Sequence, residues 1–336
     1  MIQKLFVLYG KETNPYHNLA VEESLLRWIS PGACVLYLWQ NEKTVVIGKN
    51  QNAIAECNVP MLEHDGGHLA RRISGGGAVF HDLGNLNFTF VTASEDFQVT
   101  TQTEVILRAL HQLGIPAERN GRNDLTLQDR KFSGHAYYRG RKSSFHHGTL
   151  MLQVDLEKLS AYLRPSPLKL SARMVSSVRS RVVNLCDLLP DLTTDLLKEA
   201  LADAFGNTYG LPCRILSESS LAPEMISEAE ARLSSPEWIL ADARPLPCFS
   251  ELRTPNGLLR LDYDWLDDSH NRLSAAILST DALETSLNLA AASAILQDSP
   301  LDPDVLRSRL LSGGVSVADT EQLVPFVLQL PGRIPS

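Results

Sequence analysis

Two arginines followed by three consecutive glycines form the stretch of this chain best suited to bind an anion. Arg71 and Arg72 stand just before Gly75–Gly77. The backbone N–H groups of a glycine run can approach an anionic ligand closely, because no Cβ is in the way. The planar guanidinium fork of arginine suits a phosphate or a carboxylate. By itself this pattern predicts an anion site or, equally well, a plain hairpin or bulge.

The residues after Gly84 alternate between apolar and polar types. Phe88 and Phe90 fall on one face of an extended segment, and Asn87 and Thr89 fall on the other. This alternation predicts a half-buried strand directly after the glycine-rich stretch.

Further polar segments follow in a fixed order. Residues 121–124 read Gly-Arg-Asn-Asp, residues 131–136 read Lys-Phe-Ser-Gly-His-Ala, and residues 146–150 read His-His-Gly-Thr-Leu. Together with residues 71–85, these segments resemble the lipoate–protein ligase A family. The resemblance also covers residues 18–23, 44–48 and 176–182. It spans at least residues 14–190 and fades past about residue 215.

Strands and helices alternate irregularly along the chain, so we predict an α+β fold and not a doubly wound one. The resemblance implies a large N-terminal mixed-sheet domain of the class II aminoacyl-tRNA synthetase and biotin ligase type, plus a small C-terminal α+β accessory domain. A length of 336 residues is ordinary for two domains. We expect a catalytic domain over 1–243, a linker over 244–249 and an accessory domain over 250–336.

Periodicity and breakers predict the individual elements. Strands are expected at 4–9, 34–39, 44–48, 124–128, 149–154, 258–263 and 274–279. Helices are expected at about 18–29, 101–113, 156–163, 194–205, 282–296 and 303–311. The expected N-caps are Asn18, Thr101 or Thr103, and Asp302. The link 40–43 is short enough for a hairpin.

Composition and charge limit the classes of protein to which the chain can belong. The formal net charge is −8, from 31 Lys and Arg against 39 Asp and Glu, which disfavours a nucleic-acid binder. Basic residues nevertheless concentrate in two stretches, with seven basic and two acidic residues over 119–142 and five basic and no acidic residues over 164–181. Local basic faces suit a small anionic ligand or an acidic protein partner.

Neither a membrane span nor a disulfide framework is expected. No apolar run approaches the roughly 18 residues of a transmembrane helix, and the N-terminus reads as a strand and not as a secretory signal. Five cysteines are scattered without a Cys-x-x-Cys pair, which favours reduced thiols over a zinc site. We therefore expect a cytoplasmic protein, monomeric and independent of membranes.

The resemblance implies a reaction in two halves. ATP and lipoate would give lipoyl-AMP and pyrophosphate, with Mg²⁺ accompanying ATP. The lipoyl group would then pass to a lysine of the lipoyl domains of 2-oxoacid dehydrogenase complexes and of glycine-cleavage H protein. Such an enzyme would scavenge exogenous lipoate.

The resemblance also assigns the residues. Lys131 stands at the family's catalytic-lysine position, and Arg72 is the second cation expected at the phosphate or carboxylate. The expected ATP and adenylate site comprises Arg72, Ser74, Gly75, Gly76, Gly77, Ala78, Val79, Phe80, Asn85, Asp124 and Lys131. The expected lipoate site comprises Lys131, Glu22, Trp39, Val46, Gly77 and His81, with Val79 and Phe88 as further candidates for an apolar tunnel. Asp124 is the candidate Mg²⁺ ligand.

The residues identify no general base for the transfer step. His81, His146 and His147 are candidates, and His146 and His147 would point to opposite faces of a strand, which makes them a poor metal pair. His135 stands where the family more often has a small or amide side chain. We expect a neutral His135, because an imidazolium would compete with Lys131 for the same anion.

Three other functions fit parts of the pattern. An octanoyl or lipoyl transferase of the same fold would need a cysteine nucleophile, and no cysteine lies between residues 58 and 185. Biotin ligation fits the segment at 71–81 less well than lipoate ligation does. A non-catalytic protein that binds lipoyl domains would have no use for both Arg72 and Lys131.

Overall fold

The computed structural model describes residues 1–121, 124–166, 168, 182–241, 243–297 and 299–333. The chain folds into two compact units. The first comprises Met1–Lys49, Glu56–Ser74 and Ala78–Ile239. The second comprises Asn50–Ala55, Gly75–Gly77 and Leu240–Ser336. None of the helices in these described ranges combines the length and apolar character that a membrane span requires.

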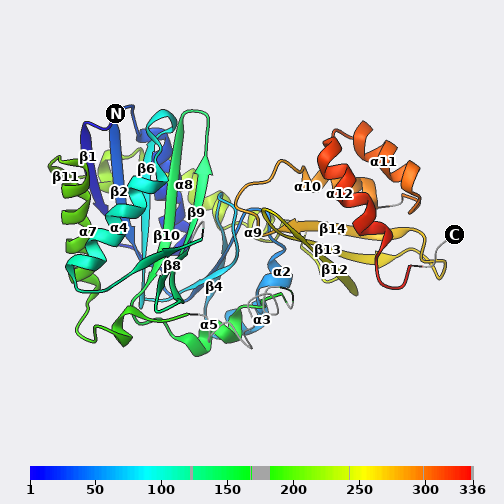
Figure 1. Cartoon of the computed structure of the whole chain (residues 1–336), viewed down its shortest axis with the longest axis horizontal. Coiled ribbons are helices and arrows are strands. Elements are labelled where there is room, and N and C mark those ends of the chain that lie inside the picture. The colour runs from blue at the N-terminus through cyan, green and yellow to red at the C-terminus, as the bar shows by residue number, and fades with distance from the viewer. Residues whose placement is uncertain (122–123, 167, 169–181, 242, 298, 334–336) are drawn as a thin grey trace. The chain divides into compact units, whose positions relative to one another are not determined.

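The first unit is built on a mixed eight-stranded sheet (Figure 1). In spatial order its strands are β11 (Cys213–Ile215), β1 (Lys4–Tyr9), β2 (Ala33–Trp39), β6 (Asn85–Ala93), β10 (Ser143–Met151), β9 (Arg130–Arg139), β8 (Asp124–Leu127) and β7 (Glu118–Asn120). Strand β1 runs parallel to both of its neighbours, and the other pairs are antiparallel. A second, small sheet joins β4 (His68–Arg71), β3 (Thr44–Ile47) and β5 (Val79–His81). The predicted α+β class is confirmed.

Helices cover both faces of the large sheet. Helices α4 (Val99–Gln112) and α7 (Thr194–Tyr209) pack on one face, in a core that includes Phe88 and Phe90. Helices α1 (Pro15–Trp28) and α8 (Pro223–Leu233) pack on the other face. The shorter helices of this unit are α3 (Val59–His64), α5 (Leu156–Tyr162) and α9 (Pro236–Leu240).

Strand β6 is buried along its whole length, so the predicted half-buried strand is wrong. Its polar residues Asn87 and Thr89 do alternate with Phe88 and Phe90, but their face is covered as well, since Thr89 meets Glu22 of α1 and Asn87 meets His81 of β5. The alternation therefore separates an apolar core from a buried polar region, not a core from solvent.

Several predicted boundaries are wrong for local reasons. Helix α1 begins at Pro15 under the cap of Asn14, whose side chain accepts the N–H groups of Tyr16 and His17, so Asn18 is an interior residue and not the N-cap. Helix α4 begins at Val99, ahead of the expected threonine caps. Residues 40–43 do not form a hairpin, because β2 and β3 belong to different sheets.

Strand β9 was not expected, although it carries the Lys-Phe-Ser-Gly segment. It follows β8 through Gln128 and Asp129, whose φ angles of 51° and 62° form a tight turn. Neither residue is the glycine that usually marks such a turn, so the sequence gives no sign of the hairpin. Its partner β10 begins at Ser143, ahead of the expected start at residue 149.

The second unit contains a three-stranded antiparallel sheet of β12 (Cys248–Thr254), β13 (Gly257–Trp265) and β14 (Leu273–Thr280). Its helices are α2 (Ala53–Glu56), α10 (Leu289–Leu296), α11 (Pro303–Ser312) and α12 (Val317–Leu328). The cap of Asp302 on α11 is confirmed, since its Oδ1 accepts the N–H groups of Asp304 and Val305 at 3.0 Å each. Helix α10 starts later than expected, and β12 and α12 were not predicted.

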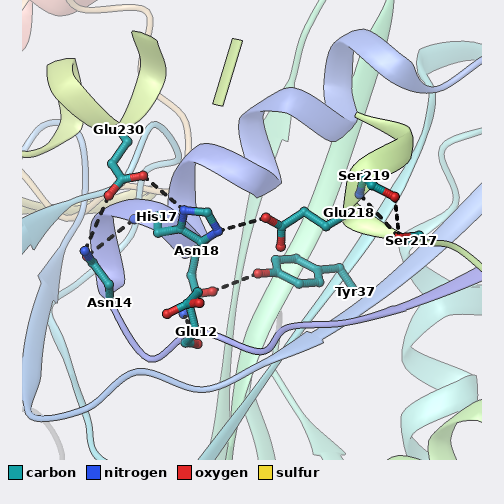
Figure 2. A network of polar contacts seen from close by, with 9 residues as sticks. All are labelled: Glu12, Asn14, His17, Asn18, Tyr37, Ser217, Glu218, Ser219 and Glu230. Carbon is teal, nitrogen blue, oxygen red and sulfur yellow. Dashed lines mark hydrogen bonds and ion pairs between the residues drawn. The ribbon is translucent and has the colours of Figure 1, made fainter. Parts of the chain in front are cut away.

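A histidine between two carboxylates fixes the first turn of α1 (Figure 2). His17 Nδ1 lies 3.0 Å from Glu230 of α8, and its Nε2 lies 3.0 Å from Glu218 of the short helix Glu218–Ser220. Both nitrogens can donate only in the imidazolium form. Burial alone would lower the pKa of His17, but the hydrogen bonds and charges of Glu230 and Glu218 outweigh it and raise the pKa.

We expect His17 to stabilise the fold most at low pH. A raised folded-state pKa contributes stability that is fully present below the unfolded value of about 6.5 and is lost as pH rises through the folded value. His17→Gln should therefore lower the melting temperature more at pH 6 than at pH 9. The exposed His64 provides the control, since His64→Gln should leave the melting temperature unchanged at both pH values. Equal losses for His17→Gln at both pH values would contradict the assignment.

Candidate active site

A continuous chain of buried polar side chains runs through the first unit. Arg72 Nε donates to Ser74 Oγ at 3.0 Å. Ser74 Oγ lies 2.8 Å from His147 Nε2, and His147 Nδ1 lies 2.8 Å from Glu22 Oε1. The participants come from α1, from β10 and from the segment after β4, and each is at most 7% exposed. The fold thus brings together three regions that the sequence keeps far apart.

Glu22 is the negative end of this chain. Its Oε1 accepts Thr89 Oγ1–H at 2.7 Å, and Thr89 in turn accepts Trp39 Nε1–H at 3.1 Å. Glu22 is 1% exposed, and these donors satisfy a carboxylate oxygen that would be costly to bury without hydrogen bonds. The sequence singled out Glu22 as unusual among apolar neighbours, and Thr89 appeared only as a polar strand residue.

Arg72 is the positive end. Burial lowers the pKa of its guanidinium to about 10, and the charge of Glu22 acts against that change. The group therefore stays cationic at neutral pH. Arg72 also donates to the Val46 carbonyl at 3.1 Å.

The adjacent Arg71 has a different role. Its guanidinium donates to the carbonyl oxygens of Lys49 and Ile239, at 2.9 and 2.8 Å. The Trp238 indole returns a hydrogen bond to the Arg71 carbonyl at 2.7 Å. Arg71 therefore ties the chain near α9 to the strand β4, while Arg72 reaches Ser74.

His81 lies beside this chain with one nitrogen unused. Its Nδ1 lies 3.1 Å from Asn41 Nδ2 and 3.5 Å from Asn87 Nδ2, so it accepts from amides and the hydrogen resides on Nε2. Burial, then the charges of Arg72 and His147, lower the pKa of His81 to about 3. His81 Nε2 and the buried Asn85 Oδ1 have no hydrogen-bond partner among the described residues.

Lys131 lies on β9 and forms an ion pair with Asp124 of β8, Nζ to Oδ1 at 2.8 Å. Its side chain is 31% exposed. A Cβ at Gly134 would fall 2.8 Å from Lys131 Nζ, so a glycine is needed there for this lysine conformation. Arg122, Asn123 and residues 176–181 of the predicted motifs lie outside the described residues.

The glycine run, Gly75–Gly77, packs against backbone of its own unit, the second one. Gly76 has a φ of 92° and donates its N–H to the Ala282 carbonyl at 3.1 Å. A Cβ at Gly75 would lie 2.3 Å from the Leu283 carbonyl oxygen, whereas one at Gly77 would meet nothing within 4 Å. The requirement for glycine is therefore strongest at Gly75, for close backbone approach, and at Gly76, for its positive φ.

The predicted apolar residues divide between two faces of the sheet. Trp39 and Val46 share one core, and Val79 pairs with Val46 across β3 and β5. Phe80 is buried against Tyr162, and Ala78 precedes β5. Phe88 packs in the other hydrophobic core, under α4 and α7. It therefore cannot line one apolar tunnel together with Trp39 and Val46, and the prediction that it does so is wrong.

His146 and His147 point to opposite faces, as predicted. His146 Nε2 lies 2.9 Å from His135 Nδ1, and both rings pack edge-on against Phe88. Burial, then the charge of Lys131, lower the pKa of His135 to about 3, so His135 is neutral at neutral pH, as expected. Burial also holds the pKa of His146 well below its ordinary value.

Comparison with known proteins connects this arrangement to a family. The model of the lipoyl protein ligase A/B catalytic domain matches residues 14–206. The chain belongs to this family. The matched range contains Glu22, Arg72, Ser74, Lys131 and His147, and the sequence resemblance to lipoate–protein ligase A is confirmed.

Solved structures of lipoyl ligases share the fold. LipL1 of P. falciparum, determined in complex with lipoate, superposes with a TM-score of 0.76 at 24% identity, covering 97% of this chain and 99% of that one. A bipartite lipoate protein ligase of Thermoplasma acidophilum is 30% identical, with a TM-score of 0.62 over 74% of this chain and 100% of that one. A lipoate–protein ligase A bound with ATP is 29% identical, with a TM-score of 0.61 over 71% of this chain and 99% of that one.

We expect His135 to contribute to acid destabilisation. Its folded-state pKa of about 3 lies below the unfolded value of about 6.5, so unfolding takes up a proton and stability falls as pH drops through that interval. His135→Asn should reduce the loss of unfolding free energy between pH 6.5 and 4.5 by up to about 1.4 kcal/mol per pH unit. Denaturant titrations would measure this, with His64→Asn as the control. If the unfolding free energy of His135→Asn falls as steeply between pH 6.5 and 4.5 as that of the wild type, the prediction is contradicted.

Proposed function

We propose that this protein is an ATP-dependent lipoate–protein ligase. It activates lipoate as lipoyl-AMP, releases pyrophosphate, and transfers the lipoyl group to a lysine of an acceptor domain. The observation that carries the proposal is the buried guanidinium of Arg72, held at Ser74 directly before the glycine run, in a chain of the lipoyl ligase family. Relatives with bound lipoate and with bound ATP support both substrates.

The first half-reaction brings a carboxylate to the α-phosphate of ATP. Two anions meet, and cations and backbone donors must be in place before charge grows on the phosphate oxygens. We assign this work to Lys131 and Arg72. Adenylate binding is assigned to Ser74, Gly75, Gly76, Gly77, Ala78, Val79, Phe80, Asn85 and Asp124.

The lipoyl tail is apolar and its carboxylate is not, so its site must combine both characters. Trp39 and Val46 supply apolar surface in one core, next to the buried polar chain that begins at Glu22. We assign lipoate binding to these three residues with Gly77, His81 and Lys131. His81 contributes an Nε2–H that no described residue uses.

Magnesium fits this site as an ion that arrives with ATP. No group of three or more His, Cys, Asp or Glu side chains in the described ranges is arranged to hold a metal. Mg²⁺ in nucleotide sites is commonly held by one or two carboxylates and the substrate phosphates, which a single Asp124 satisfies. Asp124 would hold the ion, which would screen the phosphate charges.

The acceptors proposed are lipoyl domains of 2-oxoacid dehydrogenase complexes and glycine-cleavage H protein. The Thermoplasma acidophilum ligase was studied together with its E2 lipoyl domain, which supports this class of partner. We assign catalysis to residues 1–243 and an accessory role to residues 250–336. We also propose that the protein is a monomer that scavenges lipoate in the cytoplasm, where the unpaired cysteines fit a reducing compartment.

A transferase that uses a cysteine nucleophile is disfavoured. The sequence has no cysteine from residue 58 to residue 185. Cys34 and Cys57 are buried, and burial raises the pKa of both thiols, that of Cys57 to about 12. Neither thiol has the lowered pKa that activates a nucleophile.

Lys131→Ala should abolish measurable lipoyl-AMP formation, or lower it by at least about 100-fold, because a cation at the developing phosphate charge is lost. Pyrophosphate release from ATP and lipoate would measure this, with circular dichroism to confirm folding. Lys142→Ala removes an exposed cation from the same basic stretch and should leave the rate near wild type. Unchanged turnover in Lys131→Ala would exclude the assignment.

Cysteine replacement should separate ligase from transferase chemistry. Cys57→Ala and Cys186→Ala remove the thiols that flank the cysteine-free region, and ligation should persist in both because no thiol takes part. Loss of lipoyl transfer in either folded variant, with pyrophosphate release retained, would favour a covalent thioester route.

A further inference from the structure

We propose that Ser74 and His147 accept the proton of the attacking lysine amine in the transfer half-reaction, with Glu22 as the residue that positions His147. This inference rests on the proposed ligase function and adds a base to the second step. The proposal rests on the geometry of Glu22, His147 and Ser74. His147 Nδ1 lies 2.8 Å from Glu22 Oε1, and His147 Nε2 lies 2.8 Å from Ser74 Oγ.

The hydrogen bonds fix the direction in which a proton can move. Glu22 accepts at Oε1, so His147 carries its hydrogen on Nδ1 and leaves Nε2 as an acceptor. Ser74 therefore donates its O–H to His147 Nε2. The Arg72 Nε–H uses an acceptor lone pair of Ser74 Oγ, which leaves the hydroxyl hydrogen available for the imidazole. The order is that of a hydrolase triad, in which a carboxylate sets the tautomer of the histidine.

The chemistry balances as follows. The lysine ammonium gives one proton to Ser74 Oγ as the serine hydroxyl proton moves to His147 Nε2, which leaves a neutral amine. The amine nitrogen forms a bond to the acyl carbon and releases its second proton to solvent, and the bond from that carbon to the phosphate oxygen breaks, so that AMP leaves with the electron pair. The resulting imidazolium is stabilised by Glu22, and it returns the proton to solvent after the product leaves. Ser74 is not acylated.

Other histidines of the first unit are less suited to this task. His81 uses its acceptor nitrogen on the side-chain amides of Asn41 and Asn87. His135 and His146 bond to each other and lie on the opposite face of the sheet from His147. The charged and titratable groups on the same side of the sheet as His147 are Glu22 of α1, Arg72 after β4 and His81 of β5, whereas His135 and His146 lie across the sheet.

The test separates the half-reactions. Pyrophosphate release from ATP and lipoate reports activation, and single-turnover transfer from preformed lipoyl-AMP to an isolated lipoyl domain reports the second step. Ser74→Ala and His147→Gln should slow transfer by about 10²–10⁴-fold at pH 7, the usual contribution of a general base. The deficit should shrink as pH rises toward the lysine pKa of about 10.4, because the amine then loses its proton unaided. In His147→Gln, activation should be slowed far less than transfer. Ser74→Ala should slow activation as well, because Ser74 holds Arg72 and is assigned to adenylate binding.

Two further variants keep the outcome interpretable. Glu22→Gln preserves shape and should move the pH midpoint of transfer, because a neutral amide stabilises the imidazolium less. His146→Gln changes another buried histidine on the same strand and should leave that midpoint in place. Hydroxylamine, which is uncharged at pH 7.5, should be acylated by His147→Gln nearly as fast as by wild type.

Equal losses of activation and transfer in His147→Gln at every pH would show that the Glu22–His147–Ser74 chain has only a structural role, and would overturn the inference. Unchanged transfer in folded Ser74→Ala and His147→Gln would also overturn it. Absence of pyrophosphate release in the wild type would instead reject the ligase function itself.

Discussion

The buried carboxylate of Glu22 is the constraint on which the arrangement of the site depends. A carboxyl group at 1% exposure is costly to bury unless it is hydrogen-bonded and its charge is compensated. Thr89 and His147 supply the hydrogen bonds, and Arg72 supplies the opposite charge through Ser74. Because each partner comes from a different element, satisfying one side chain fixes the relative placement of α1, β6, β10 and the segment after β4.

The large sheet allows this polar region to exist inside the protein. Strand β6 lies fourth among eight strands, and its side chains alternate between two buried environments. Phe88 and Phe90 complete an apolar core under α4 and α7. On the other side Thr89 meets Glu22 and Trp39, and Asn87 meets His81. One face of β6 thus provides the apolar packing that stabilises the strand, and the opposite face positions the polar side chains of the candidate site.

Neighbouring residues acquire unlike roles through the same alternation. His146 faces the apolar core and is kept neutral by burial, while His147 joins the carboxylate and hydroxyl. Arg71 binds backbone carbonyls near α9, while Arg72 reaches Ser74. In both pairs, one residue supports the fold and the other faces the polar chain, because successive side chains of an extended segment point in opposite directions.

Sequence alone determined the family, the α+β class, and the opposed directions of His146 and His147, since ordered motifs and a two-residue period survive without coordinates. It also singled out Glu22, Arg72 and Ser74 as separate candidates. Only the tertiary structure decided that these side chains form one chain with His147, because hydrogen bonds between residues up to 125 positions apart leave no local pattern. The same reason explains why β6 was expected to be half exposed and why 40–43 was expected to turn back as a hairpin. Which surface covers a strand, and which strand it pairs with, is settled by long-range packing and not by the residues of the strand itself.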